Sequence, residues 1–175
     1  MSQQRTHAHS LFVIGGARSG KSAFAQRLAE ASGLIPVYVA TATAGDAEMA
    51  RRIDAHRAAR GLQWQLAEAP LELTAAILRE AQTGRMLLVD CLTLWLSNLM
   101  HAGRNLDAEA LGLVSALPGL PGQIIFVSNE VGAGIVPDNR LARDFRDAHG
   151  RLNQQVAAAC DAAVLVVAGL PLTLK

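Results

Sequence analysis

The chain of 175 residues has few aromatic side chains, little net charge, two cysteines and no long apolar run. Phe, Trp and Tyr make up 4% of it, too few to favour a surface on which nucleic-acid bases stack. Sixteen Lys and Arg against fifteen Asp and Glu give a formal net charge of +1, which provides no general attraction to a nucleic-acid backbone. We therefore expect no nucleic-acid partner.

The cysteines and the short apolar runs bear on the compartment. Cys91 and Cys160 are far apart in the sequence and form no C-x-x-C pair, which excludes a disulfide scaffold and a cysteine-rich zinc module. No apolar run approaches the roughly 20 residues that a membrane span needs. Residues 1–10 are polar and lack the apolar core of a signal peptide. The sequence predicts a cytoplasmic protein without a transmembrane segment.

Short runs rich in β-branched residues alternate with longer amphipathic segments, and 51% of the residues are apolar. The runs predicted to form strands are residues 11–14, 37–40, 86–89, 124–127 and 164–168, with a further candidate at 62–66. The predicted helices are residues 19–32, 46–60, 71–82, 92–101 and 139–159. Residues 103–122 are the least regular part. Strands that are apolar on both faces are typical of a parallel sheet between two layers of helices.

A glycine-rich segment follows the first predicted strand and precedes a predicted helix. It matches G-x-x-x-x-G-K-S and consists of Gly15, Gly16, Ala17, Arg18, Ser19, Gly20, Lys21 and Ser22. Its backbone N–H groups and the helix N-terminus bind phosphate, while Lys21 reaches the β- and γ-phosphates and Ser22 binds Mg²⁺. A turn that binds nothing is the alternative, which the complete motif disfavours. We predict one α/β domain over residues 11–175, a doubly wound, mainly parallel sheet like that of P-loop NTPases, after a flexible extension over residues 1–10.

Two carboxylates follow short apolar segments. Asp90 ends the run at residues 87–89 and fits the second nucleotide-binding motif, in which a carboxylate at the end of a strand helps to hold the metal ion. Glu68 ends another short segment. It is either a second carboxylate near the nucleotide or an exposed loop residue, and its spacing leaves both interpretations open.

The predicted helix at residues 46–60 carries His56 on the same face as Arg52 and Arg60. Guanidinium groups nearby favour the neutral, nucleophilic imidazole and are also able to hold phosphates. On these residues alone, a solvated helix face with an incidental histidine is favoured. His101 and His149, each just before a glycine, are interpreted as residues at helix ends.

The segment at residues 128–140 follows a predicted strand, where open α/β sheets place their ligands. It ends in Pro137, Asp138 and Asn139, a combination typical of a helix start. A purely structural loop before an exposed helix is the alternative. GGARSGKS at residues 15–22 and NEVGAGIVPDNRLARDFRDAHGRLNQQVA at residues 129–157 closely resemble the bifunctional adenosylcobinamide kinase/adenosylcobinamide-phosphate guanylyltransferase family of cobalamin biosynthesis. The resemblance extends over nearly the whole chain.

The resemblance implies two reactions and an assembly. The first phosphorylates the hydroxyl of the aminopropanol arm of adenosylcobinamide with ATP or GTP. The second transfers GMP from GTP to the new phosphate and gives adenosyl-GDP-cobinamide and pyrophosphate. Adenosylcobinamide and its phosphate are thus the expected corrinoid partners, and the family implies a homo-oligomer, a trimer.

The resemblance also implies the site residues. A GMP–histidine intermediate forms in a segment that resembles EMARRIDAHRAAR, which changes the interpretation of His56 from an incidental residue to the nucleophile. Ala55 precedes it where some relatives have a second histidine. Lys21 is the other catalytic residue, and Ser22 and Asp90 hold Mg²⁺. Besides the loop, the implied nucleotide-binding residues are Ala40, Thr41, Ala42, Arg57, Ala58, Ala59, Arg60, Glu68 and Asp90.

Two other functions use the same loop. A regulatory GTPase would carry a guanine-reading N-K-x-D pattern, which the sequence lacks. The D-x-x-G match of this sequence, Asp147 to Gly150, falls inside a predicted helix and does not follow a strand. A small-molecule kinase without nucleotidyl transfer would need neither His56 nor the segment at residues 128–140. Both remain alternatives to the bifunctional enzyme.

Overall fold

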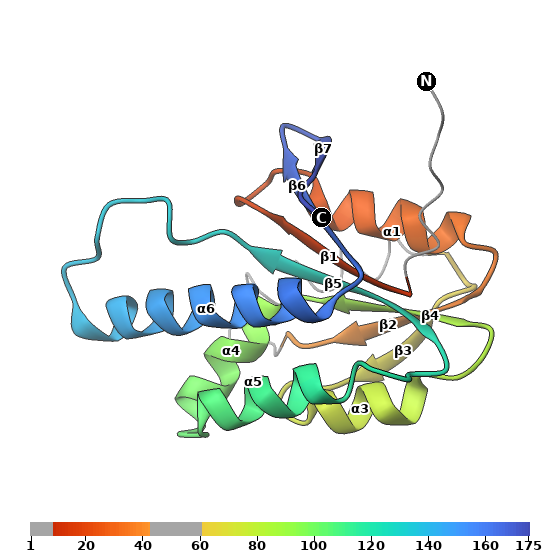
Figure 1. Ribbon diagram of the computed structural model, residues 1–175, viewed down its shortest axis with the longest axis horizontal. Helices are drawn as coiled ribbons and strands as arrows, with labels where there is room; N and C mark the ends of the chain where they lie inside the picture. The colour runs from red at the N-terminus through yellow and green to blue at the C-terminus, as the bar shows by residue number, and fades with distance from the viewer. Residues whose placement is uncertain (1–8, 43–60) are drawn as a thin grey trace.

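The described residues, 9–42 and 61–175 of a computed structural model, build a seven-stranded sheet in the order β3-β2-β4-β5-β1-β6-β7 (Figure 1). The strands are β1 (Ser10–Gly15), β2 (Ile35–Ala40), β3 (Gln65–Glu68), β4 (Arg85–Asp90), β5 (Gln123–Asn129), β6 (Ala162–Val167) and β7 (Leu170–Thr173). Every neighbouring pair is parallel except β6 and β7, which are antiparallel. The prediction of a mainly parallel sheet is confirmed.

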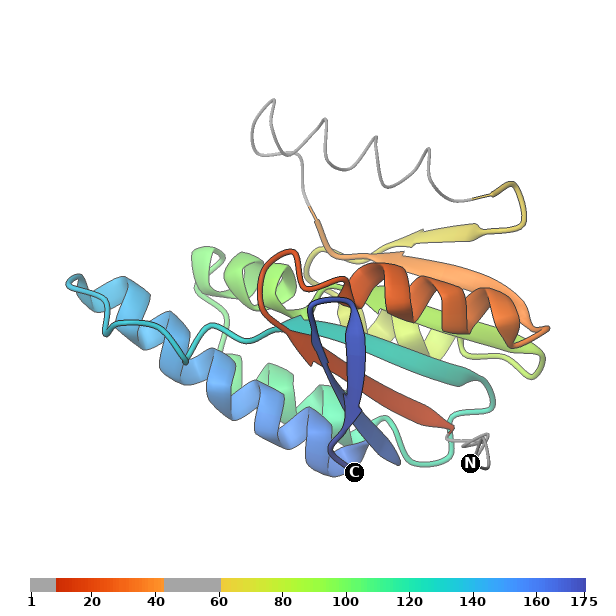
Figure 2. The same ribbon diagram turned by 90° about the horizontal axis from the view of Figure 1, so that it is seen from above.

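Helices cover both faces of this sheet, as the sequence predicts. They are α1 (Lys21–Ala31), α3 (Leu73–Glu80), α4 (Leu92–His101), α5 (Leu106–Ser115) and α6 (Arg140–Ala159). Helix α1 lies on one face, and α3 to α6 lie on the other (Figures 1 and 2). The predicted helix at residues 46–60 falls wholly on residues outside the described part of the chain, as do residues 1–8 of the predicted extension.

The two faces of the sheet bury separate apolar clusters. In β4, Leu87 and Val89 pack into the cluster formed with α3 to α6, whereas Met86 and Leu88 pack into the cluster that contains Ala25 and other α1 residues. Because side chains alternate along a strand and both sides are covered, the strand reads as an uninterrupted apolar run. This is the physical reason why the sequence located β4 and β5 well.

Helix α5 and strand β7 are the elements that the sequence did not locate. Helix α5 lies inside the segment expected to be least regular, and its first turn is capped by Asn105, whose Oδ1 accepts a hydrogen bond from the Ala108 N–H at 3.0 Å. Strand β7 is short, contains Pro171 and has four exposed residues. Neither element shows the clear apolar periodicity on which the other assignments rest. The candidate strand at residues 62–66 forms further along the chain, as β3.

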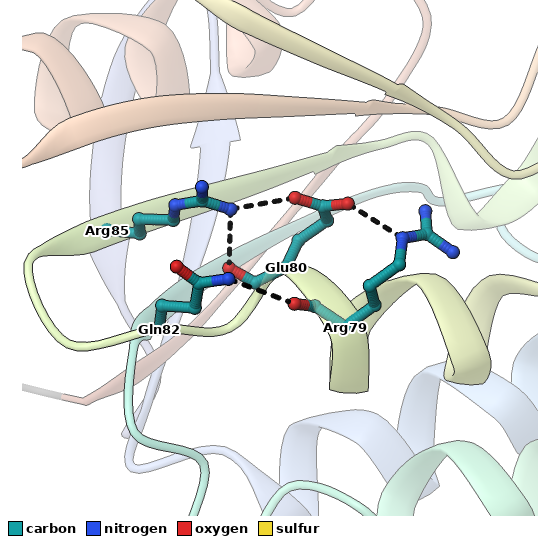
Figure 3. Close-up of polar contacts among 4 residues, drawn as sticks. All are labelled: Arg79, Glu80, Gln82 and Arg85. Carbon is teal, nitrogen blue, oxygen red and sulfur yellow. Dashed lines mark hydrogen bonds and ion pairs between the residues drawn. The ribbon is translucent and has the colours of Figure 1, made fainter.

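The connection from α3 to β4 lies at the amino ends of the strands and is held by charged side chains (Figure 3). Arg85 Nη1 donates to Glu80 Oε2 at 2.8 Å, and Arg79 Nε donates to Glu80 Oε1 at the same distance. Gln82 Nε2 lies 3.5 Å from the carbonyl oxygen of Arg79. These contacts fix the edge of the sheet opposite to the one where the glycine-rich loop lies.

Candidate phosphate-binding site

The loop between β1 and α1 combines positive φ angles with a helix N-terminus that has no side-chain cap. Arg18 and Gly20 have positive φ angles of 56° and 93°, and the Ser19 N–H donates to the carbonyl oxygen of Gly16 at 3.3 Å. Gly20 precedes α1 and provides no side-chain cap. The first N–H groups of α1 are therefore not satisfied by a capping side chain, and a helix end of this kind attracts an anion.

Lys21 folds back over this loop. Its Nζ donates to the carbonyl oxygen of Gly16 at 3.1 Å, and the residue is only 8% exposed. Burial lowers the pKa of Lys21, an effect that Cys91 and Asp90 oppose through their charges. The ammonium group thus lies within electrostatic reach of the end of β4, as expected of a lysine that neutralises phosphate oxygens next to a metal-binding carboxylate.

The turn between β6 and β7 contacts the loop through its backbone. The Gly169 N–H donates to the Ser19 carbonyl oxygen at 2.8 Å. Ala168 and Gly169 have φ angles of 52° and 80°, and Val167 pairs with Leu170 across this two-residue turn. This contact does not follow from the sequence pattern, although the glycine directly after the predicted strand at residues 164–168 is a signal for a turn.

Three adjacent strands, β3, β2 and β4, end at the same edge of the sheet as the loop. In register, Ala40 of β2 pairs with Glu68 of β3 on one side and with Asp90 of β4 on the other. The Tyr38 hydroxyl lies 3.3 Å from Asp90 Oδ2 and donates to it. The structure therefore brings Ala40, Glu68 and Asp90 to one edge of the sheet, although two strands, β2 and β4, separate the strand of Glu68 from β5, the neighbour of the loop strand.

The hydroxyl group of Thr41 is hydrogen-bonded to the backbone of Cys91. Thr41 is fully buried, its Oγ1 donates to the carbonyl oxygen of Cys91 at 2.8 Å, and the Cys91 N–H donates to the same Oγ1 at 2.8 Å. Asn98 Nδ2 donates to the Thr41 carbonyl oxygen. The predicted nucleotide-binding stretch Ala40, Thr41 and Ala42 is thus tied at its centre to the end of β4, and the carbonyl oxygens of Ala40 and Thr41 already accept hydrogen bonds from the Ala69 N–H and from Asn98.

Ser22 and Asp90 offer oxygen ligands that suit Mg²⁺. Among residues 9–42 and 61–175, no three His, Cys, Asp or Glu residues gather into a metal-binding group. A magnesium ion here would rely on a hydroxyl, one carboxylate, water and the phosphates of its nucleotide, which is the usual pattern for Mg²⁺ in nucleotide sites. The residues present fit that ion.

Five of the predicted site residues lie outside the described part of the chain: His56, Arg57, Ala58, Ala59 and Arg60. The described part of the chain has no helix with the length and hydropathy needed to cross a membrane.

His149 is the polar residue that sequence reasoning misjudged. It lies well inside α6 and is fully buried, so its interpretation as a helix-end residue is wrong. Its Nε2 lies 2.9 Å from Thr93 Oγ1 and 3.3 Å from Ser128 Oγ, and its Nδ1 lies 3.3 Å from Asn153 Nδ2. Burial lowers the pKa of His149, which the charge of Glu130 opposes. The helix continues past Gly150 because Leu152 and Val156 extend its buried face.

The segment between β5 and α6 extends away from the sheet (Figure 1). Its end is the predicted helix start: Asn139 Oδ1 accepts a hydrogen bond from the Ala142 N–H at 2.8 Å. Arg143 Nη1 donates to the carbonyl oxygens of Pro137 and Asp138 at 2.9 and 2.7 Å. Ile135 is 97% exposed. The segment is therefore anchored at both ends and presents apolar surface between them.

Comparison with known proteins gives matches over nearly the whole chain. Residues 11–174 match the family described as cobinamide kinase / cobinamide phosphate guanyltransferase. The chain is 52% identical over 165 residues to a bifunctional adenosylcobalamin biosynthesis protein of Pseudomonas aeruginosa, with 93% of this chain and 95% of that protein covered. It is 39% identical over 180 residues to the protein of that description from Salmonella typhimurium, with 94% and 99% covered.

A solved structure of a Pyrococcus horikoshii protein is similar in fold. Its TM-score is 0.55 at 11% sequence identity, and the match covers 95% of this chain and 85% of that one. At this identity the likeness extends to the arrangement of strands and helices alone.

Proposed function

Because the chain belongs to the cobinamide kinase / cobinamide phosphate guanyltransferase family, we propose that it catalyses two successive steps on a corrinoid. It phosphorylates adenosylcobinamide with ATP or GTP, and it then transfers GMP from GTP to adenosylcobinamide phosphate, releasing pyrophosphate. The observation that carries the proposal is the loop at residues 15–22, with Lys21 folded over it, in a chain that matches this family over residues 11–174.

The loop suits the kinase step. The alcohol of the substrate attacks the γ-phosphorus while the bond to the bridging oxygen of the β-phosphate breaks. Lys21 and the N–H groups at the start of α1 offset the negative charge that spreads over the phosphate oxygens. Ser22 and Asp90 would hold Mg²⁺, which supplies further charge neutralisation when bound. The proposed nucleotide contacts at Ala40, Ala42 and the Glu68 carboxylate extend from the adjacent strand ends.

The guanylyl step needs a different electrophile. The attack falls on the α-phosphorus of GTP, and pyrophosphate leaves. We assign the attack to His56, whose neutral imidazole would form the phosphorus–nitrogen bond of a GMP–histidine intermediate. Arg57 and Arg60 provide charge for the phosphates, with Ala58 and Ala59 between them. The phosphate of adenosylcobinamide phosphate then displaces the histidine and takes the GMP group.

The first test measures the mass of the intact protein after incubation with GTP and Mg²⁺. We expect wild-type protein to gain the mass of GMP, in an acid-labile linkage, and to gain nothing with ATP. His56→Ala should lose the adduct but keep cobinamide phosphorylation, because the kinase step does not use the imidazole. His101→Ala is the matched control, since His101 is exposed at the end of α4, where its Nδ1 lies 2.7 Å from the Ser97 carbonyl oxygen.

Two results would contradict this division of work. An adduct that persists in His56→Ala assigns the nucleophile elsewhere, and loss of both activities in a folded His56→Ala protein removes the separation of the steps. Lys21→Ala should impair both steps, and full retention of either one would exclude a shared loop. A protein that binds GTP and phosphorylates cobinamide but never forms an adduct is a plain kinase, and one that only hydrolyses GTP fits the GTPase alternative.

The proposal extends to assembly and compartment. We expect a homo-oligomer, a trimer as the family resemblance implies, which light scattering of the purified protein would measure. Exposed apolar residues on β7, Leu170 and Leu172 among them, are consistent with a covered surface. Cys91 and Cys160 are free and buried, and burial raises the pKa of Cys160 to about 12. Unpaired thiols suit the cytoplasm, which is the proposed location.

A further inference from the structure

Asn129 ends β5, the strand between the one that leads into the phosphate-binding loop and the one that ends at Asp90. It pairs in register with Gly15, and the N–H of the following residue, Glu130, donates to the Gly15 carbonyl oxygen at 3.0 Å. Val127, two residues earlier, packs on the α1 face of the sheet. Because alternate residues of a strand face the same side, Asn129 presents its side chain on the face where the loop and α1 lie.

The amide group of Asn129 is held in one orientation. Its Nδ2 donates to Thr93 Oγ1 at 3.0 Å and lies 4.0 Å from Cys91 Sγ. Its main-chain N–H donates to the same Thr93 oxygen at 3.0 Å, and its carbonyl oxygen accepts from Asn153 Nδ2 at 3.1 Å. The Thr93 oxygen in turn lies 2.9 Å from Nε2 of buried His149. Helices α4 and α6 thus fix both the backbone and the amide hydrogens.

The remaining polar atom of this side chain is Oδ1. No donor from the described part of the chain reaches it. Among those residues, the buried side-chain atoms without a hydrogen-bond partner are Ser19 Oγ and Thr74 Oγ1, so Asn129 Oδ1 is not a buried atom. Oδ1 therefore keeps solvent-accessible surface, and its residue lies in register with Gly15 at the start of the loop. An amide oxygen accepts hydrogen bonds and donates none, so it repels phosphate oxygens and suits a hydroxyl group.

We propose that Asn129 Oδ1 accepts a hydrogen bond from the alcohol that receives the phosphoryl group, and so holds that alcohol beside the terminal phosphate. The assignment rests on the proposed kinase function. The alcohol oxygen bonds to the γ-phosphorus as the bond to the β–γ bridging oxygen breaks. The nucleoside diphosphate leaves, and the alcohol proton passes to a phosphate oxygen and then to water. A neutral amide takes no proton, so Asn129 orients the nucleophile by hydrogen bonding alone.

The test compares Asn129→Ala with Gln123→Ala, a change at the opposite end of the same strand. For each we would measure kcat and KM for cobinamide phosphorylation, the Kd of ATP and the half-saturating Mg²⁺ concentration. Asn129→Ala should lower kcat/KM for cobinamide by about tenfold to a hundredfold, because a misplaced nucleophile is costly, and leave the Kd of ATP unchanged. Gln123→Ala should match the wild type in every measurement.

The GMP adduct provides the check on folding, since its formation does not use the alcohol. Should Asn129→Ala fail to fold, Thr93→Val serves instead: it removes the anchor of the amide and should raise the cobinamide KM with the Kd of ATP intact. Equal kinase activity in Asn129→Ala and wild type overturns the assignment. So does weaker ATP binding with an unchanged cobinamide KM, which would make Asn129 a nucleotide ligand.

A raised half-saturating Mg²⁺ concentration with an unchanged cobinamide KM also overturns it, because Oδ1 would then serve a metal-bound water. The proposed function fails separately. Wild-type protein that phosphorylates no cobinamide refutes the kinase and this assignment together, whereas active wild type with an equally active Asn129→Ala refutes this assignment alone.

Discussion

Gly15 and Gly16 are neighbours in the loop but are required for different reasons. A Cβ atom on Gly15 would lie 2.4 Å from the Val166 carbonyl oxygen and 2.6 Å from Ser19 Oγ. A Cβ atom on Gly16 would meet nothing within 4 Å. The first glycine of the motif therefore allows β1 to pack against β6, and this requirement exists before any phosphate binds.

We expect Gly15→Ala to destabilise the protein by about 2 kcal/mol or more, since the atom it meets belongs to the backbone and a strand must move. Gly16→Ala should change the free energy of unfolding by less than about 0.5 kcal/mol. Urea unfolding of both variants measures the difference. If both substitutions changed the free energy of unfolding equally, the steric difference between the two positions would not explain why glycine occupies each of them.

Residue by residue, the sequence predicts the loop better than its surroundings. The motif fixes the roles of Lys21 and Ser22 by chemistry, because few arrangements bind phosphate as closely. It says nothing of the contact that fixes Thr41 to Cys91, because two residues fifty positions apart meet only once the sheet forms. His149 was misjudged for a related reason: a glycine next to it suggested a helix end, and tertiary packing of α6 overrode that local preference.

At the scale of elements, the β6–β7 turn determines the position of the loop. Its Gly169 N–H donates to Ser19, and a Cβ atom on Gly20 would lie 3.1 Å from the Gly169 Cα. The loop and the turn are thus in contact at two successive residues. Because the turn needs positive φ angles, Gly169, which lies far from the phosphate-binding loop in the sequence, supports the conformation of that loop.

Gly169→Ala and Gly84→Ala separate this support from plain backbone strain. Their φ angles are 80° and 84°, and a Cβ atom at either position meets nothing within 4 Å. Each substitution should cost about 1 to 2 kcal/mol of stability. Only Gly169→Ala should also weaken GTP binding severalfold, since Gly84 lies in the α3–β4 turn at the other edge of the sheet. Calorimetric titration measures the affinity of each variant for GTP. Equal affinities of Gly169→Ala and Gly84→Ala would argue against support of the loop by the β6–β7 turn.

For the whole molecule, the order of the strands is what places the site. Alternation of apolar runs with amphipathic segments predicts a parallel sheet with helices on both faces, because that is how such runs become buried. The order β3-β2-β4-β5-β1-β6-β7 does not follow from this alternation. It depends on which strand each crossover reaches. The role of Asn129 could therefore not be predicted, since it depends on β5 lying between β1 and β4.

The buried histidine should make the stability of the whole protein depend on pH. Burial lowers the pKa of His149 in the folded state below its ordinary value near 6.5, so the unfolded chain binds the proton more readily. Stability is then complete above that ordinary value and decreases as the pH falls below it, by up to about 1.4 kcal/mol per pH unit. Unfolding in urea at about pH 7.5 and about pH 5.5 tests this.

His149→Gln should be less stable than wild type at neutral pH, because it disturbs the contacts to Thr93 and Asn153, but it should lose less on acidification. His101→Gln, at an exposed histidine, is the control and should keep the wild-type dependence. A His149→Gln protein that loses as much stability as wild type between the two pH values would assign the dependence to other groups.

The contact between Ser19 and Gly169 also has a consequence for protein synthesis. The loop is translated before the turn that supports it, and β1, α1 and β5 all precede that turn in the chain. A nascent chain that already contains β1, α1 and β5 would have the sequence that binds phosphate without the backbone that supports it. Nucleotide would then bind tightly only after β6 and β7 have joined the edge of the sheet, so the order of translation delays ligand binding until the fold is nearly finished.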